Sequence, residues 1–352
     1  MDATEKDHVG ISLLRFIAQA ERIADVIGHV LELGNLIVVC QDDSVSFPLE
    51  IEQLFDKINA SPARTEIYTS RYHWLISLFH MDSQTTYRLG FIGAGKLAGS
   101  VIRGLMRAGF CSPTEMIASE PNDQVRATLR EEVGIKLTTE NAEIAETAEL
   151  ILIGVKPGVV LPVLRSLAAR LQNKPVISLA AGVRITAMEP IAGVRFMRAM
   201  TNTPSAICRA ATALVRGSRT TNEDADLART IFNAIGVAVE VTEDQIDVVT
   251  ALAGSGPAFV YSMIEALAEG GKKMGLAPDA ALTLATQTVF GAAQLASESK
   301  LSPEELRKVV VTPGGTTAAG LAAMEKLRTA EGLIAAVEAA TKRGQEMAKE
   351  NL

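Results

Sequence analysis

The stretch RLGFIGAGKLAGS, residues 88–100, decides the fold. Its first half is a short apolar run that predicts a buried strand, and its second half begins a segment of good helix formers. Gly93 and Gly95 stand between the two halves, where the chain must turn directly from a strand into a helix. The stretch therefore predicts a strand–turn–helix unit, the first step of an α/β sheet.

Apolar runs and helical stretches alternate from this unit to about residue 241. The expected strands are 88–93, 116–119, 149–155, 175–182, 194–200 and 211–217. Expected helices include 97–109 and 122–134, which close at Gly109 and Gly134, and 159–171. Near-continuous apolar strands between helices predict a parallel sheet covered on both faces. Beyond residue 241 only helical patterns remain, in 247–276, 278–299, a helix that begins near 316, and 329–350.

Composition divides the chain into three parts. Residues 1–80 hold all four histidines, the only tryptophan and most of the net charge of −7. We interpret them as an N-terminal extension of unknown role, either an appended, poorly ordered region or a docking segment. Residues 81–242 are predicted to form the sheet domain, and residues 243–352 an all-α domain.

The net charge, the length of the apolar runs and the cysteine and histidine positions argue against several functional classes. An acidic chain offers no basic surface for nucleic acid or an acidic membrane. No apolar run reaches the roughly 18 residues of a membrane helix. Cys40, Cys111 and Cys208 are isolated, and the acidic N-terminus lacks signal features, so we expect a cytoplasmic protein. No histidine follows residue 80, so no metal site is expected.

The turn GAGKLA, residues 93–98, reads as the G-x-G-x-x-A fingerprint of dinucleotide binding. Gly93 is expected to make the tight turn, Gly95 to admit the pyrophosphate, and Ala98 to pack the helix against the sheet. Free amides at the helix start then bind the phosphates. The alternative, that the glycines only make a turn, is weakened by the strand and helix on either side.

Glu120 follows the second expected strand, where dinucleotide-binding sheets meet the adenosine ribose. Its carboxylate suits the free hydroxyl of NAD and repels the 2′-phosphate of NADP. Arg126, one helical turn later, can offset that repulsion, and a solvated loop carboxylate is the simpler interpretation. The sequence therefore leaves NADPH and NADH open. Lys156, at the end of another strand, is either a candidate acid or a solvated lysine.

Gly314, Gly315, Thr316 and Thr317 precede a helix and are expected to form its first turn. Free amides and hydroxyls there make a binding site for an anion, and a carboxylate suits it. The alternative is simple N-capping by a threonine. Because no histidine is available as a general acid after residue 80, reduction of a carboxylated cyclic imine fits, since its nitrogen can be protonated beforehand.

At this point the residues resemble a known family. The motifs GFIGAGKLA, GVKPGVV, SLAAGV, MTNTPSA, ALAGSGPAFVY, EALAEGGKKMGL and TPGGTTAAGLAAME occur in the order found in pyrroline-5-carboxylate reductases. The resemblance runs from about residue 88 to the C-terminus. It implies an N-terminal Rossmann domain, and a C-terminal helical domain that interlocks with a second subunit and binds substrate. It also implies a homodimer, which in this family often assembles into decamers.

The resemblance implies an activity and residue roles as well. The reaction is hydride transfer from NADPH or NADH to 1-pyrroline-5-carboxylate, which gives L-proline. Pyrophosphate contacts fall on Ile92, Gly93, Ala94, Gly95, Lys96 and Leu97, an adenosine contact on Asn141, and nicotinamide contacts on Val155, Lys156, Pro157 and Ala181. Substrate contacts fall on Gly315, Thr316 and Thr317, with Glu243 and Ser255 near the substrate. Thr317 is the catalytic candidate, because its hydroxyl can assist the imine nitrogen.

Two departures from the family pattern leave alternatives open. Glu120 replaces the small polar residue that relatives tend to carry, and Lys308-Val309-Val310-Val311 replaces a polar cofactor contact. One alternative is a reductase of another imine or of a 3-hydroxy acid, with Lys156 as the acid–base group. The other is a non-catalytic nucleotide-binding relative.

Overall fold

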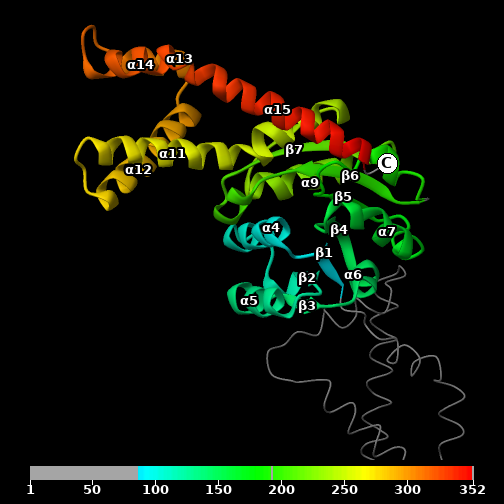
Figure 1. Ribbon diagram of the computed structural model, residues 1–352. Coiled ribbons are helices and arrows are strands. Elements are labelled where there is room, and N and C mark those ends of the chain that lie inside the picture. Colours follow the sequence, from blue (N-terminus) through cyan, green and yellow to red (C-terminus); the bar gives the residue numbers. More distant parts are fainter. Residues whose placement is uncertain (1–85, 192, 351–352) are drawn as a thin grey trace, which may run out of the picture. The chain divides into compact units, whose positions relative to one another are not determined.

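The computed structural model describes residues 86–191 and 193–350, which belong to one compact unit, Gln84–Leu352 (Figure 1). The predicted N-terminal extension, residues 1–80, lies outside the described residues. The unit begins with an α/β sheet and continues as helices only, so the predicted fold class is confirmed.

Eight strands form one sheet in the order β3-β2-β1-β4-β5-β6-β7-β8. The strands are β1 (Tyr87–Ile92), β2 (Met116–Ser119), β3 (Lys136–Thr138), β4 (Ala148–Ile153), β5 (Pro175–Ser178), β6 (Arg195–Met200), β7 (Ala210–Arg216) and β8 (Gly236–Glu240). All neighbours pair in parallel except β6 and β7. The predicted parallel sheet is therefore confirmed except at the β6–β7 pair, which is antiparallel. Only residues 201–209 join β6 to β7, and a parallel crossover needs about a dozen residues or more.

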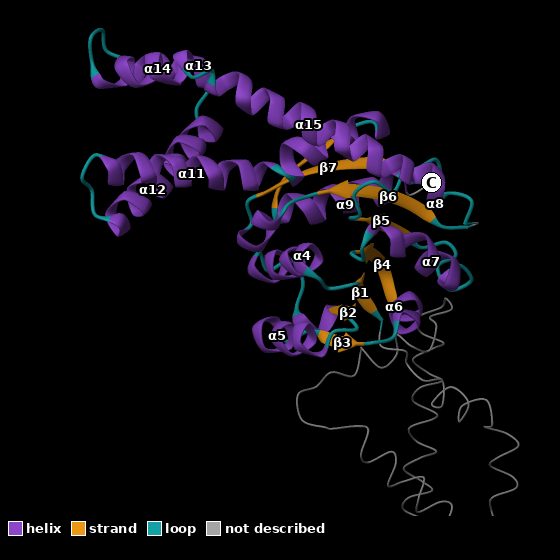
Figure 2. Ribbon diagram, viewed as in Figure 1, coloured by secondary structure: helices purple, strands orange, loops and turns teal. Residues whose placement is uncertain are grey.

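Helices cover both faces of this sheet (Figure 2). They are α4 (Lys96–Arg107), α5 (Asp123–Val133), α6 (Asn141–Thr147), α7 (Pro157–Leu167), α8 (Ile185–Met188) and α9 (Asn222–Ala234). Short 3-10 turns are η2 (Pro113–Glu115), η3 (Thr203–Ile207) and η4 (Glu243–Gln245). Buried residues of α4, α5 and α9 share one hydrophobic cluster, and those of α6, α7 and α8 share another. The two clusters lie on opposite faces of the sheet because alternate residues of a strand point in opposite directions.

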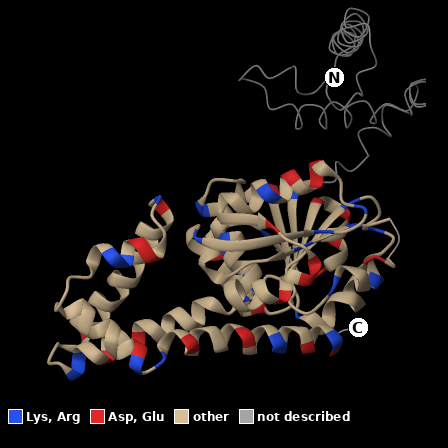
Figure 3. Ribbon diagram, turned by 90° about the horizontal axis from the view of Figure 1, so that it is seen from above, with Lys and Arg blue, Asp and Glu red and all other residues tan. Residues whose placement is uncertain are grey.

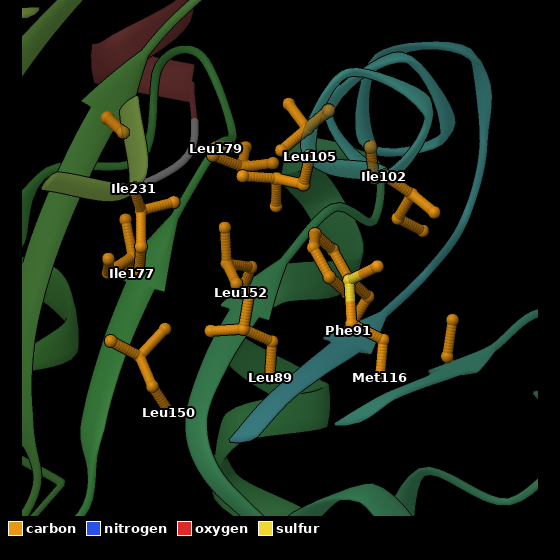
Figure 4. Close-up of a cluster of buried hydrophobic side chains, with 14 of the residues drawn as sticks. Leu89, Phe91, Ile102, Leu105, Met116, Leu150, Leu152, Ile177, Leu179 and Ile231 are labelled. Carbon is orange, nitrogen blue, oxygen red and sulfur yellow. The ribbon is translucent and has the colours of Figure 1, made fainter. Parts of the chain in front are cut away.

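The first cluster is shown in Figure 4, where Leu89 and Phe91 of β1 lie beside Leu152 of β4. Ile102 and Leu105 of α4 close over them, and all five side chains are buried. Each such side chain contributes roughly 1.5–3 kcal/mol relative to an exposed one. This packing fixes α4 over β1, and therefore fixes the turn that joins them.

Several predicted boundaries are confirmed by local chemistry. Gly134 ends α5 in the left-handed conformation, with φ of 68°. Asn122 is the N-cap of the same helix, and its side chain accepts a hydrogen bond from the amide of Val125. Strand β2 spans the expected residues, whereas the expected strands 149–155 and 175–182 end earlier, at Ile153 and Ser178. The residues after those two ends form loops at the edge of the sheet.

The C-terminal region contains α10 (Ile246–Val249), the π-helix η5 (Thr250–Gly254), α11 (Gly256–Lys273), α12 (Pro278–Glu298), α13 (Pro303–Val310), α14 (Thr316–Lys326) and α15 (Thr329–Glu350). Helix α15 returns to the sheet and packs against α10 and η5, where Gly344 and Ala348 are buried. By contrast, α13 and α14 have no buried residues. Among the described residues, no helix is both long and apolar enough to cross a membrane.

Candidate active site

Three strand ends define one edge of the sheet. Strand β1 lies between β2 and β4, and the three strands end at Ile92, Ser119 and Ile153. The chain order reverses at β1, because its successor β2 lies on one side and β4 on the other. Open α/β sheets bind ligands at the carboxyl edge beside such a reversal.

The glycine turn at this edge has the shape that a dinucleotide needs. Gly93 has φ of 87°, and a Cβ there would lie 2.8 Å from Cγ1 of Val155. Its amide donates to the carbonyl of Ser119 at 2.9 Å. Around Gly95, by contrast, a Cβ would meet no heavy atom within 4 Å. The turn is therefore closed toward the protein and open outward, so the residues present fit a bound pyrophosphate.

The start of α4 leaves donors free in front of this opening. Gly95 is the N-cap, without a side-chain capping bond, and it accepts from the amide of Gly99 at 2.7 Å. In the described part of the chain, the amides of Lys96, Leu97 and Ala98 have no partner. Such amides attract anions.

Close packing of α4 explains the alanine of the fingerprint. Ala98 is fully buried, and a Cβ on Gly154 would lie 2.5 Å from the Cβ of Ala98. Gly154 follows β4, so two small residues let α4 approach the sheet edge. The predicted packing role of Ala98 is confirmed.

Glu120 reaches back to the glycine turn. Its Oε2 accepts from the amide of Ala94 at 3.2 Å, and its Oε1 accepts from the amide of Asn122 at 3.0 Å. Asn141, at the start of α6, accepts a hydrogen bond from Oγ of Ser119 at 2.6 Å through its Oδ1. The structure thus brings both predicted adenosine-side residues together beside the turn.

The predicted nicotinamide residues follow the next two strands. Val155 is half-buried against Gly93, and the exposed Lys156 is the N-cap of α7, which begins at Pro157. Ala181 is half-buried in the loop after β5. These residues share the carboxyl edge with the glycine turn. Their contact with nicotinamide stays a prediction.

Glu243 forms an ion pair that was not predicted from the sequence. Nη1 of Arg198 donates to Oε1 of Glu243 at 2.7 Å, and the amide of Ile185 donates to the same oxygen at 3.1 Å. The Arg198 side chain is only 2% exposed. Its Nη2 also donates to the carbonyl of Ala180 at 3.3 Å, next to Ala181. An arginine within the apolar run VRFMRAM was the signal that could have found this pair.

Ser255 is the N-cap of α11 and directly follows the π-helix η5. Its amide donates to the carbonyl of Thr250 at 2.9 Å, and π-helical turns occur frequently at functional sites. Asn202, just after β6, donates through Nδ2 to the carbonyl of Ala253 at 3.0 Å. Ser255 is therefore held near the carboxyl end of β6.

The second predicted anion site also has free amides. Gly315 is the N-cap of α14, without a side-chain capping bond, so the alternative of a capping threonine was wrong. Gly314 has φ of 73°, and the amide of Gly315 donates to the carbonyl of Thr312 at 3.0 Å. The first main-chain hydrogen bond of α14 runs from the amide of Ala319 to the carbonyl of Gly315. The amides of Thr316 and Thr317 thus have no partner in the described part of the chain.

One chain does not bring the two anion sites together. Helices α11 to α14, residues 256–326, form a helical arm that extends from the sheet, as Figures 1 and 3 show in two views. Figure 1 shows α14 at the far end of this arm, apart from α4 and β1. Within the described residues, no group of His, Cys, Asp or Glu could hold a metal ion. The chemistry that the site can support is therefore anion binding and positioning at two separate helix starts.

Comparison with known proteins agrees with this arrangement. Residues 243–347 match the family model of the pyrroline-5-carboxylate reductase dimerisation domain, and residues 88–182 match a family of coenzyme F420-dependent NADP oxidoreductases. The match to the dimerisation domain indicates a homodimer.

Individual relatives extend the match to most of the chain. A pyrroline-5-carboxylate reductase of Pisum sativum is 40% identical over 74% of this chain and 96% of its own length. The solved structure of the reductase from Coxiella burnetii has a TM-score of 0.69 at 34% identity and covers 75% of this chain and 99% of that one. The solved structure of Plasmodium falciparum pyrroline carboxylate reductase, with NADP bound, has a TM-score of 0.68 at 28% identity. It covers 75% of this chain and 99% of that one. With both regions matched in order, the chain belongs to the pyrroline-5-carboxylate reductase family.

Proposed function

We propose that this protein reduces 1-pyrroline-5-carboxylate to L-proline. A hydride from the nicotinamide adds to the imine carbon of the ring, and the ring nitrogen carries the proton. The observation that carries the proposal is the start of α14, where a glycine N-cap leaves the amides of Thr316 and Thr317 without partners. A small carboxylate completes those hydrogen bonds.

A bound nicotinamide dinucleotide, NADPH or NADH, supplies the hydride. The pyrophosphate lies on the turn 92–97, and Asn141 contacts the adenosine side. Val155, Lys156, Pro157 and Ala181 line the nicotinamide. The open space at Gly95 and the free amides of α4 support this placement.

The substrate needs orientation more than a strong acid. Gly315, Thr316 and Thr317 hold its carboxylate and ring, and the hydroxyl of Thr317 hydrogen-bonds to the imine nitrogen. Glu243 and Ser255 lie near the substrate. Because an imine nitrogen can be protonated before the hydride arrives, a hydroxyl that orients it is sufficient.

Two subunits complete each site. The arm exposes large apolar side chains, among them Tyr261, Leu267, Leu284, Phe290 and Leu295, each at least half exposed. Exposed apolar surfaces of this kind mark protein interfaces. A second subunit covers this surface, and α14 of one subunit reaches the carboxyl edge of the other. We also propose that the dimers assemble into a decamer.

The same proposal covers the organisation of the chain. Residues 81–242 bind the dinucleotide, and residues 243–352 dimerise and bind substrate. We place the protein in the cytoplasm, which the free thiols of Cys111 and Cys208 support.

Turnover tests the proposal directly. Full-length protein is expected to oxidise NADH or NADPH only when the imine is added. Thr317→Ala should lower kcat/KM about 10- to 100-fold, because a bond to the reacting nitrogen is lost. Thr230→Ala is the matched control, since its hydroxyl only donates to the carbonyl of Asp226 on the exposed surface of α9. Unchanged kinetics in Thr317→Ala would refute the site, and turnover of a 3-hydroxy acid instead of the imine would refute the substrate.

A further inference from the structure

The residues around Glu120 point to the choice of dinucleotide, and the inference rests on the proposed function of this site. Glu120 directly follows β2, whose last residue, Ser119, pairs with Ile92 of β1. The carboxylate is therefore beside the glycine turn, on the side where the adenosine ribose lies in sheets of this type.

The carboxylate is held in place by main-chain donors. The amide of Ala94 donates to one oxygen and the amide of Asn122 to the other. Each carboxylate oxygen still has a lone pair free to accept another hydrogen bond, and an ionised carboxylate can accept hydrogen bonds but cannot donate them. Two ribose hydroxyls can donate to it, whereas a 2′-phosphate offers more negative charge.

The nearby arginine is already engaged. Arg126 donates through Nη1 to the main-chain carbonyl of Glu120 and through Nη2 to the carboxylate of Asp123. Its side chain is 17% exposed. A guanidinium that is paired and largely covered does not turn toward a phosphate without losing both contacts.

The local balance of charge is therefore acidic. Glu120 and Asp123 supply two carboxylates, and Arg126 supplies one cation that Asp123 already pairs. A 2′-phosphate placed here meets an uncompensated negative charge, and like charges at contact distance weaken binding strongly. A ribose with both hydroxyls free meets two good acceptors instead.

We propose that this chain prefers NADH to NADPH and that Glu120 determines the preference. Residues 88–182 match an NADP oxidoreductase family, and the Plasmodium falciparum structure holds NADP. The preference thus separates this chain from relatives that bind the phosphorylated dinucleotide.

Direct binding tests the preference without any imine present. NADH and NADPH are titrated separately into full-length protein by calorimetry, and we expect NADH to bind at least about tenfold more tightly. Glu120→Gln removes the charge and keeps the shape, so it should tighten NADPH binding about tenfold and reduce the preference. Glu131→Gln, on the exposed surface of α5, changes net charge equally and should leave both affinities unchanged.

Each result has one meaning. Equal or tighter binding of NADPH by the natural chain would overturn the preference, and so would an unchanged ratio in Glu120→Gln. Binding of neither dinucleotide would overturn both this inference and the proposed function. Preferential NADH binding without turnover of the imine would refute the proposed reaction and leave the preference intact.

Discussion

Arg198 and Glu243 join the sheet to the first turn of the helical region. Their ion pair spans 2.7 Å between Nη1 and Oε1, and the same arginine holds the loop carbonyl of Ala180. The second carboxylate oxygen of Glu243 is buried without a partner in the described part of the chain. One arginine therefore holds both the loop that carries the predicted nicotinamide residue Ala181 and the predicted substrate residue Glu243.

Breaking this pair should destabilise the protein. Arg198→Met leaves the mostly buried Glu243 carboxylate without its cation and with only the amide of Ile185 as a donor, which is expected to cost about 3 kcal/mol of unfolding free energy. The double variant Arg198→Met with Glu243→Gln should lose less unfolding free energy than the sum of the losses in the two single variants, because it no longer carries the unpaired charge. Thermal unfolding measures both. Arg343→Met, which breaks exposed pairs with Glu346 and Glu350, is the control and should cost less than about 1 kcal/mol. Equal effects of Arg198→Met and Arg343→Met would contradict the proposed anchor.

Gly154 should tolerate no side chain. A Cβ there would lie 2.5 Å from Ala98 and 2.7 Å from the carbonyl oxygen of Gly93, so Gly154→Ala pushes α4 away from the glycine turn. We expect dinucleotide affinity to fall at least about tenfold, as calorimetry can measure. Gly158→Ala is the matched control. Its Cβ meets nothing within 4 Å on α7, so binding should be unchanged and stability should rise by roughly 0.5–1 kcal/mol.

Asp224 should make the free energy of unfolding depend on pH under acidic conditions. Burial raises the pKa of this carboxyl, but bonds from Arg195 and Thr221 outweigh burial and leave the pKa below its ordinary value. A depressed folded-state pKa contributes stability above the unfolded value of about 3.9, and that contribution is lost as pH falls through the folded value.

Asp224→Asn should therefore cost about 2 kcal/mol of unfolding free energy at neutral pH, and the difference should shrink below about pH 4. Urea unfolding at a series of pH values measures it. Asp226→Asn alters an exposed carboxylate of the same helix and should show little effect. A constant difference between Asp224→Asn and the natural chain down to acid pH would contradict this account.

Phe290 should lie in the dimer interface. Its side chain is 52% exposed on α12 of the single chain, so Phe290→Glu places a charge where a partner subunit covers apolar surface. We expect a weaker dimer and lower activity that recovers as protein concentration rises, measured by sedimentation and by kinetics. Thr230→Glu, which adds the same charge on the exposed surface of α9 in the sheet domain, should leave assembly unchanged. A stable dimer in Phe290→Glu would place the interface elsewhere on the chain.

Local chemistry made part of the structure predictable. Gly93 and Gly134 both adopt left-handed conformations that favour glycine, and the sequence placed turns at both. Strands β3 and β8 were not predicted. Lys136–Thr138 is too short to show a period, and Gly236–Glu240 is an edge strand with little burial. Helix α13 carried a readable signal that was missed, the capping box of Ser302 and Glu305.

Long-range contacts were the limit of prediction. Arg198 and Glu243 are 45 residues apart in the sequence, and only the folded sheet brings them together. Glu120 was predicted as a ribose acceptor, but the engagement of Arg126 by Asp123 depends on side-chain geometry. The separation of Thr317 from the glycine turn follows from the direction of the arm, which no local pattern encodes.

A crystal structure of the full-length protein with a nicotinamide dinucleotide and L-proline tests the central claim most directly. The account predicts the proline carboxylate at about 3 Å from the amides of Thr316 and Thr317, with the ring facing the nicotinamide held by the partner subunit. Proline bound elsewhere, or a start of α14 that faces away from the nicotinamide with no carboxylate on its amides, would contradict it.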